Sequence, residues 1–200
     1  MGRRLPRHPT PPADLSSRSL PHVGWGATLF RIHPLSRDAL HFGKSRKHRF
    51  DDPEGQYGVL YAGASWLGAF IETAGHHTGR SFVTTSWLEK RAVSEIRPRR
   101  KLRLVDLRGR GLARLKADAR LSSGEHGLSQ EWSRALWSHP AKPDGICYAS
   151  RHDPKQVSVA LFERARADLK PRLIGCLGAR NMDTMVAQAL DHYELGLIPD

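Results

Sequence analysis

The sequence has few cysteines and no long apolar run, and each lack excludes a class of protein. Its 200 residues include two cysteines, Cys147 and Cys176, which form neither a CxxC pair nor a zinc-finger spacing. A disulfide-stapled secreted domain is therefore excluded, and reduced thiols are typical of a cytoplasmic protein. No stretch approaches the roughly 20 apolar residues of a membrane span. The N-terminus lacks the apolar segment of a signal peptide, so we expect a cytoplasmic location and no membrane partner.

Several common site motifs are missing as well. The eleven histidines form no HExxH or HxH pattern. The rings of the adjacent His76 and His77 diverge, which makes them a poor metal pair. The glycines between residues 55 and 68 form neither a GxGxxG motif nor a Walker loop. We therefore expect no metal site, and recognition of phosphate would fall to arginine.

Acidic residues are scarce relative to basic ones. Lysine and arginine number 32 against 20 aspartates and glutamates, and the formal net charge of +12 favours an anionic partner or substrate. We interpret the two basic groups, residues 44–49 and 99–101, as solvated surface rather than as dedicated polyanion sites. The sequence contains no helix-turn-helix signature, zinc finger or RNP-like aromatic strand. A basic, non-catalytic nucleic-acid-binding protein nevertheless stays an alternative.

Proline separates the N-terminal segment from the rest of the chain. Residues 1–22 hold five prolines and almost no periodic apolar pattern, which predicts a flexible Pro/Arg-rich tail. The remaining residues, 23–200, suit a single domain with an apolar core. Their composition and apolar patterns are those of an ordinary globular protein.

Strand and helix patterns occur without a regular βαβ order. The clearest unit is a strand over 58–62 that turns into a helix over 66–75, with Ser65 and Gly75 as caps. Further strands are predicted at 27–32, 87–96, 102–107, 145–149, 157–162 and 173–177, and further helices at 36–42, 112–119, 129–137 and 183–192. Residues 43–56 are predicted to be a loop. The mixture favours an α+β domain over a doubly wound sheet.

Three polar side chains stand out, although each has a simpler interpretation from pattern alone. Glu72 lies beside the apolar stripe of its helix, where a carboxylate can face a cleft or simply water. Arg31 lies in the middle of its strand and points away from its apolar neighbours. Ser150 ends a strand, where a small polar residue often makes no more than a turn. Cys147 is interpreted as a buried strand cysteine rather than a nucleophile.

Five segments in order carry a more specific signal. They are Leu29–Pro34 (LFRIHP), Phe42–Gly43, His48–Gly55 (HRFDDPEG), Tyr57–Ala62 (YGVLYA) continued by Ala69–Ala74 (AFIETA), and Asp144–Arg151 (DGICYASR). Each segment is weak alone, but their order and spacing are specific along roughly residues 25–180. In these segments the chain resembles the RES-domain family, named for its Arg, Glu and Ser signature. Ile32 is a departure, since some relatives carry an aromatic residue there.

The resemblance implies a RES-like catalytic domain over residues 23–200, with a fold similar to that of ADP-ribosyltransferase toxins. Family members are typically toxins of toxin–antitoxin pairs that degrade NAD⁺ and are held by an Xre-type antitoxin. We therefore expect an NAD⁺ glycohydrolase or NAD⁺ phosphorylase, and ADP-ribosyl transfer to a protein is the alternative. NAD⁺ would be the substrate, with no metal and no separate cofactor. A homodimer is also among the expected assemblies. The protein would contact nucleic acid only through the antitoxin.

Residue by residue, the resemblance implies a site of Arg31, Arg49, Tyr61, Glu72 and Ser150. The expected catalytic residues are Glu72, Arg31 and Ser150, and the expected NAD⁺ ligands are Arg31, Arg49, Tyr61 and Ser150. The planar fork of arginine suits a diphosphate, and the Tyr61 ring can stack on nicotinamide or adenine. Breaking the nicotinamide–ribose bond builds positive charge on the ribose, which the Glu72 carboxylate can stabilise. Ser150 would hydrogen-bond the nicotinamide side or the ribose.

Overall fold

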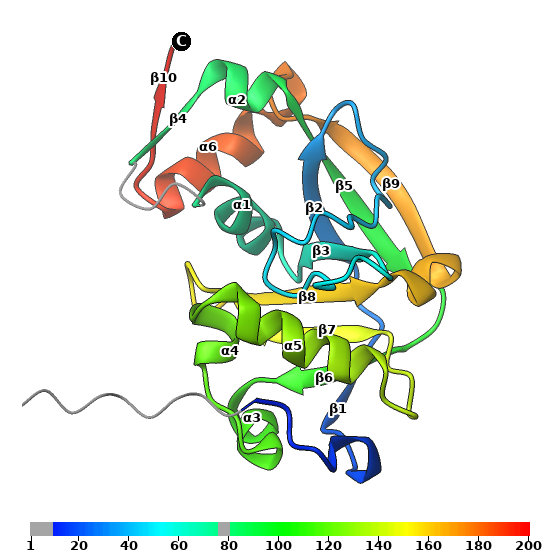
Figure 1. Ribbon diagram of the computed structural model, residues 1–200. Helices are drawn as coiled ribbons and strands as arrows, with labels where there is room; N and C mark the ends of the chain where they lie inside the picture. The colour runs from blue at the N-terminus through cyan, green and yellow to red at the C-terminus, as the bar shows by residue number, and fades with distance from the viewer. Residues whose placement is uncertain (1–9, 76–80) are drawn as a thin grey trace, which may run out of the picture.

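One curled sheet of eight strands organises the described part of the chain (Figure 1). The computed structural model describes residues 10–75 and 81–200. The strands lie in the order β1 (His22–Trp25), β6 (Leu102–Leu107), β7 (Gly145–Ala149), β8 (Val157–Phe162), β3 (Val59–Gly63), β2 (Leu29–Pro34), β5 (Arg91–Pro98) and β9 (Leu169–Cys176). Neighbouring strands are antiparallel except β6 and β7, which are parallel. β4 (Phe82–Thr84) and β10 (Gly196–Ile198) form a separate parallel pair. The predicted single α+β domain is confirmed.

Helices pack against both halves of this sheet. α1 (Trp66–Ala74), α2 (Thr85–Glu89) and α6 (Asp183–His192) gather near β2 and β5, whereas α4 (Arg120–Ser123) and α5 (His126–Trp137) lie across β7 and β8 (Figure 1). The remaining elements are α3 (Gly109–Leu115) and three 3₁₀ turns, η1 (Leu15–Ser17), η2 (Glu163–Asp168) and η3 (Arg180–Met182). No helix in the described ranges is long and apolar enough to cross a membrane.

Strand alternation sends neighbouring side chains into different cores. In β7, Ile146 and Tyr148 pack with Trp132 of α5 on one face of the sheet. Cys147, between them, packs on the other face with Leu60 of β3. A third apolar cluster lies under α1 and α6. The cluster with α5 therefore brings the end of β7 close to the start of the α4–α5 segment.

α1 begins directly after β3, as the sequence predicts, and the two elements pack closely against each other. Ser65 caps the helix by accepting the N–H of Gly68 at 2.9 Å. A Cβ on Gly63 would lie 2.5 Å from the backbone nitrogen of Ala69, so glycine is required for this approach. α1 buries its apolar side against the core, and Glu72 on its other side is left accessible.

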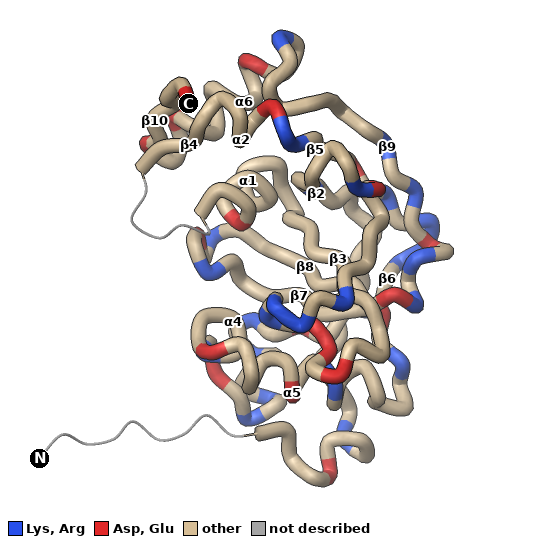
Figure 2. Tube along the Cα trace, turned by 45° about the horizontal axis from the view of Figure 1, so that its top comes forward, with Lys and Arg blue, Asp and Glu red and all other residues tan. Residues whose placement is uncertain are grey.

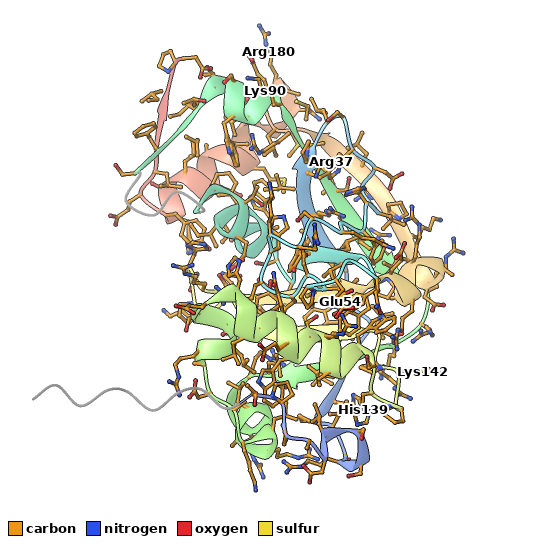
Figure 3. The ribbon with its side chains drawn as sticks, viewed as in Figure 1. Arg37, Glu54, Lys90, His139, Lys142 and Arg180 are labelled. Carbon is orange, nitrogen blue, oxygen red and sulfur yellow. The ribbon has the colours of Figure 1, made fainter. Side chains whose placement is uncertain are left out.

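Residues 10–22, the described part of the N-terminal segment, differ from the flexible tail that its prolines predict. Leu15 and Leu20 are each 4% exposed and belong to the core cluster under α5. Nε2 of His139 lies 3.1 Å from the Leu15 carbonyl and 3.2 Å from the Arg18 carbonyl (Figure 3). The packed chain therefore begins before Val23. Two isolated leucines give no periodic signal, and residues 1–9 lie outside the described residues.

Two other predicted elements are wrong. The helix predicted over 36–42 does not form, because the Asp38 side chain accepts the Leu40 N–H in a turn that competes with helix. The strand predicted over 87–96 begins at Arg91. Thr84 accepts the Trp87 N–H and starts α2 in its place. The sequence also gives no prediction for β4, β10 or α4.

Basic residues occur at many separate places along the chain, several of them beside acidic ones (Figure 2). In the run 99–101, Arg100 contacts both carboxylate oxygens of Asp144 at 2.7 and 2.8 Å and also pairs with Asp168. Asp144 is buried and accepts the Arg103 N–H at 2.7 Å. The ion pair thus ties the start of β6 to the start of β7, and this part of the basic run serves the fold.

We predict that Asp144→Asn lowers the free energy of unfolding by about 1–2 kcal/mol at pH 7, because an amide cannot accept all of these bonds. Burial opposes ionisation, but hydrogen bonds from Arg100 and Arg103 hold the pKa of Asp144 below its ordinary value of 3.8. The unfolded chain therefore takes up the proton first, and the contribution of Asp144 is lost as pH falls below about 4.

Urea unfolding at pH 7 and pH 3 measures this effect. The difference between wild type and Asp144→Asn should shrink at pH 3. Asp191→Asn, at an exposed position of α6, should match wild type at both pH values. An equal difference between wild type and Asp144→Asn at both pH values would contradict the prediction.

Candidate active site

A cavity of about 480 Å³ opens between α1, β2 and β3 on one side and the α4–α5 segment on the other. Four of the five predicted site residues line it, namely Arg31, Arg49, Tyr61 and Glu72. They come from β2, from the loop after it, from β3 and from α1. The fifth, Ser150, follows β7 and lies directly behind Glu72. The fold thus brings together five residues that are far apart in the sequence.

Glu72 is held through one of its two carboxylate oxygens. Oε1 accepts the Ser150 hydroxyl at 2.5 Å and the backbone N–H of Arg151 at 3.2 Å. The Ser150 oxygen in turn accepts the N–H groups of His152 and Asp153, each at 3.2 Å. A serine hydroxyl has one proton and two acceptor positions, so Ser150 is fully used in holding Glu72 and its own loop. Its observed contacts are those of a positioning residue, and it does not line the cavity as an NAD⁺ ligand would.

Glu72 lines the cavity, and neither of these two contacts involves its other carboxylate oxygen, Oε2. Within residues 10–75 and 81–200, no hydrogen bond reaches Oε2. Among the described residues that line the cavity, Glu72 is also the sole carboxylate. A ligand in the cavity therefore meets one fixed negative charge with an available oxygen.

Arg31 projects from the middle of β2 and is anchored by backbone carbonyls. Its Nη1 donates to the carbonyls of Ala39 and His41 at 2.8 and 2.9 Å. No carboxylate forms an ion pair with it within the described residues. Burial and the nearby Arg37 lower the pKa of Arg31 to about 10, which still leaves it charged at neutral pH.

Arg49 is anchored in a similar way, by neutral oxygen atoms, on the side of the cavity that the α4–α5 segment forms. It is 8% exposed, and its Nη1 donates to the Gly124 carbonyl at 2.7 Å and to Ser129 Oγ at 3.4 Å. Burial and the positive charge of Arg151 lower the pKa of Arg49. Like Arg31, it has no ion-pair partner in the part of the chain described here. The cavity therefore contains two cations that form no ion pair with a carboxylate of the described residues, which is the setting of an anion site.

Tyr61 offers its ring rather than its hydroxyl. The hydroxyl donates to Asp51 Oδ1 at 3.0 Å and accepts the N–H of Phe50 at 2.9 Å. Burial and Asp51 raise the pKa of Tyr61 well above its usual value, so the phenol keeps its proton. The ring lies 5.6 Å from the ring of His48. Stacking on a planar ligand is the contact that this geometry leaves to Tyr61.

Sequence reasoning missed part of the cavity wall. The missed residues include Tyr148, Arg151 and His48. They lie within segments that carry the family resemblance, beside predicted site residues, and that position could have identified them. His126 gave no signal, because its contact with the cavity depends on the fold. Its Nδ1 donates to the Lys47 carbonyl at 2.9 Å, across 79 residues of chain.

Groups outside this cavity do not add a second reactive centre. Within the described ranges, no three His, Cys, Asp or Glu side chains gather as a metal-binding group. His76 and His77 lie outside the described residues. Cys147 is fully buried, and burial raises the pKa of its thiol to about 12, so it is not a thiolate at neutral pH.

The chain is similar to known proteins in sequence and in fold. A family model described as RES domain matches residues 28–176. "Probable toxin y4kH" of Sinorhizobium fredii is 39% identical over 98 residues, which cover 48% of this chain and 75% of the relative. The crystal structure of the M. tuberculosis MbcT–MbcA toxin–antitoxin complex contains a chain similar in fold, with a TM-score of 0.65 at 18% identity. That match covers 83% of this chain and 92% of the other. Because the family model matches well over half of the chain, the chain belongs to the RES domain family.

Proposed function

We propose that this protein is a toxin of a toxin–antitoxin system and that it degrades NAD⁺ by cleaving the nicotinamide–ribose bond. One observation carries the proposal: a half-buried arginine and a buried one, neither with an ion-pair partner among the described residues, line the same cavity as one anchored carboxylate. NAD⁺ presents a matching pattern, a diphosphate beside a sugar that becomes cationic as its bond breaks. The names of the two relatives, a probable toxin and a toxin–antitoxin complex, support the toxin part of the proposal.

The arginines supply the binding part of the proposal. Arg31 and Arg49 are anchored through Nη1, and no described residue accepts a hydrogen bond from their Nη2 or Nε atoms. Those N–H groups suit the paired oxygens of a phosphate. A diphosphate would also neutralise both charges, which offsets the cost of holding them in the cavity.

Glu72 supplies the chemical part. The bond between ribose C1′ and the nicotinamide nitrogen breaks, and its electron pair leaves with the ring, which becomes neutral. Positive charge develops on the ribose, and Glu72 would stabilise it through Oε2 while Ser150 holds Oε1. Water or phosphate then forms the new bond to C1′, and the water route releases a proton. In this proposal NAD⁺ is the substrate, and no metal or separate cofactor takes part.

Product analysis after incubation with NAD⁺, with and without phosphate, tests the proposal directly. Free nicotinamide with ADP-ribose identifies hydrolysis, and phosphorylated ADP-ribose identifies phosphorolysis. ADP-ribose attached to protein identifies the transfer reaction. Intact NAD⁺ in every mixture contradicts the proposal, and retardation of DNA by the same protein would then favour a nucleic-acid-binding role.

We also propose that an antitoxin, of the Xre type that the resemblance implies, covers the cavity. An open NAD⁺-degrading site would be harmful to the cell that makes it. The net charge of +12 favours an acidic covering segment, with fast and salt-sensitive association. Expression without the antitoxin should arrest growth, and harmless high-level expression of an NAD⁺-active protein would exclude this partner.

We predict that Glu72→Gln lowers kcat by about 10²–10³-fold with little change in KM, because the amide keeps the shape but loses the charge. Initial rates of nicotinamide release measure both constants. Glu131→Gln, at an exposed position of α5, is the matched control and should stay active. Near-normal turnover by Glu72→Gln would remove Glu72 from the catalytic role.

We predict that Arg31→Lys raises KM more than it changes kcat. Lysine keeps the charge but loses the planar fork and the two carbonyl contacts, so we expect KM for NAD⁺ to rise about tenfold or more while kcat changes less. Arg37→Lys, on the exposed segment after β2, should leave both constants unchanged. An unchanged KM in Arg31→Lys would exclude Arg31 from diphosphate binding.

A further inference from the structure

We infer that Asp51 is a positioning residue of this site, which fixes Tyr61 and the segment that carries His48 and Arg49. Asp51 does not line the cavity itself. In the sequence it is the first residue of an acidic turn, and the family resemblance gives it no role. The inference rests on the proposed function, because the residues that Asp51 holds are those proposed to bind NAD⁺.

Asp51 is a buried carboxylate held by neutral donors. It is 1% exposed. Its Oδ1 accepts the Tyr61 hydroxyl at 3.0 Å, and its Oδ2 accepts the Ser45 hydroxyl at 2.9 Å and the His48 N–H at 3.2 Å. No described lysine, arginine or histidine forms an ion pair with it. A buried charge is costly unless it is hydrogen-bonded, so the carboxylate and its three donors fix one another.

These bonds determine where two parts of the cavity wall lie. The Tyr61 hydroxyl is fixed between Asp51 and the Phe50 N–H, so its ring cannot turn out of the wall without breaking both bonds. His48 is held at its backbone by Asp51, and its ring lies against the Tyr61 ring. Arg49 lies between His48 and Phe50, whose backbones are both bonded in this network. The backbone that carries the Arg49 side chain is therefore held in place on both sides.

Asp52 provides a matched control. It is adjacent, carries the same charge and is also 1% exposed. Its carboxylate accepts the Gln56 N–H and Nη1 of Arg134, neither of which lines the cavity. Loss of the Asp52 charge therefore affects the scaffold, whereas loss of the Asp51 charge affects the scaffold and the site.

The test compares KM and kcat for NAD⁺ in Asp51→Asn and Asp52→Asn. An asparagine side chain has one acceptor oxygen, so Asp51→Asn cannot accept from Tyr61 on one side and from Ser45 and His48 on the other at the same time. Since Tyr61 and Arg49 are proposed to bind the substrate, we expect KM to rise about 10–100-fold with a smaller change in kcat. Asp52→Asn should keep the wild-type KM. A loss of folded protein alone would lower the apparent kcat and leave KM unchanged.

A milder variant covers the case in which Asp51→Asn fails to fold. Tyr61→Phe removes one of the three donors and keeps the ring, so it should raise KM in the same direction. Where both variants fold, the effects of Tyr61→Phe and Asp51→Asn should add only in part, because Tyr61 and Asp51 belong to one hydrogen-bond network. If wild type consumes NAD⁺ and these variants keep the KM of Asp52→Asn, Asp51 is not a positioning residue. If wild type leaves NAD⁺ intact, the proposed function fails and the inference fails with it.

Discussion

Opposite charges face one cavity in this protein without forming an ion pair, and the surrounding structure keeps them apart. Ser150 and the backbone N–H of Arg151 hold Glu72 on one side. Backbone carbonyls hold Arg31 and Arg49 on the others, and neither arginine has an ion-pair partner among the described residues. A salt bridge from Glu72 to either guanidinium would satisfy both groups and leave less charge for a ligand. The separation therefore leaves both kinds of charge available to a ligand in the cavity.

Carbonyl anchors solve a particular problem for a buried cation. A carbonyl satisfies N–H donors and fixes the guanidinium plane, but it adds no negative charge that would cancel the cation. The cost of this arrangement appears in Arg31, whose pKa burial lowers to about 10. An anion that enters the cavity offsets that cost, so the site is more favourable with a ligand than without one. Tyr61 follows the same logic, because its hydroxyl is satisfied internally and its ring is left for the ligand.

Local patterns in the sequence predicted the β3–α1 unit, whereas Tyr61 and Glu72 became candidate site residues through the family resemblance. The β3–α1 unit follows from one apolar strand, a serine cap and helical spacing, and it places Tyr61 and Glu72 on adjoining elements. The contribution of the α4–α5 segment could not be predicted in this way. The Gly124 carbonyl reaches Arg49 across 75 residues, and no spacing within one element encodes that contact. The same limit explains Leu15, which packs in the core although its neighbours show no pattern.

The net charge of +12 is a weaker guide to function than the partners of individual arginines. Arg100 is basic in composition but is paired with two aspartates and serves the fold. Arg91 and Arg164 lie 4.3 and 5.0 Å from the centres of tryptophan rings, and neither lines the cavity. Arg31 and Arg49 differ because they line the cavity and are anchored by neutral groups, with no ion pair among the described residues. An arginine therefore indicates an anionic ligand only where the fold places it at a cavity, and composition alone does not show that.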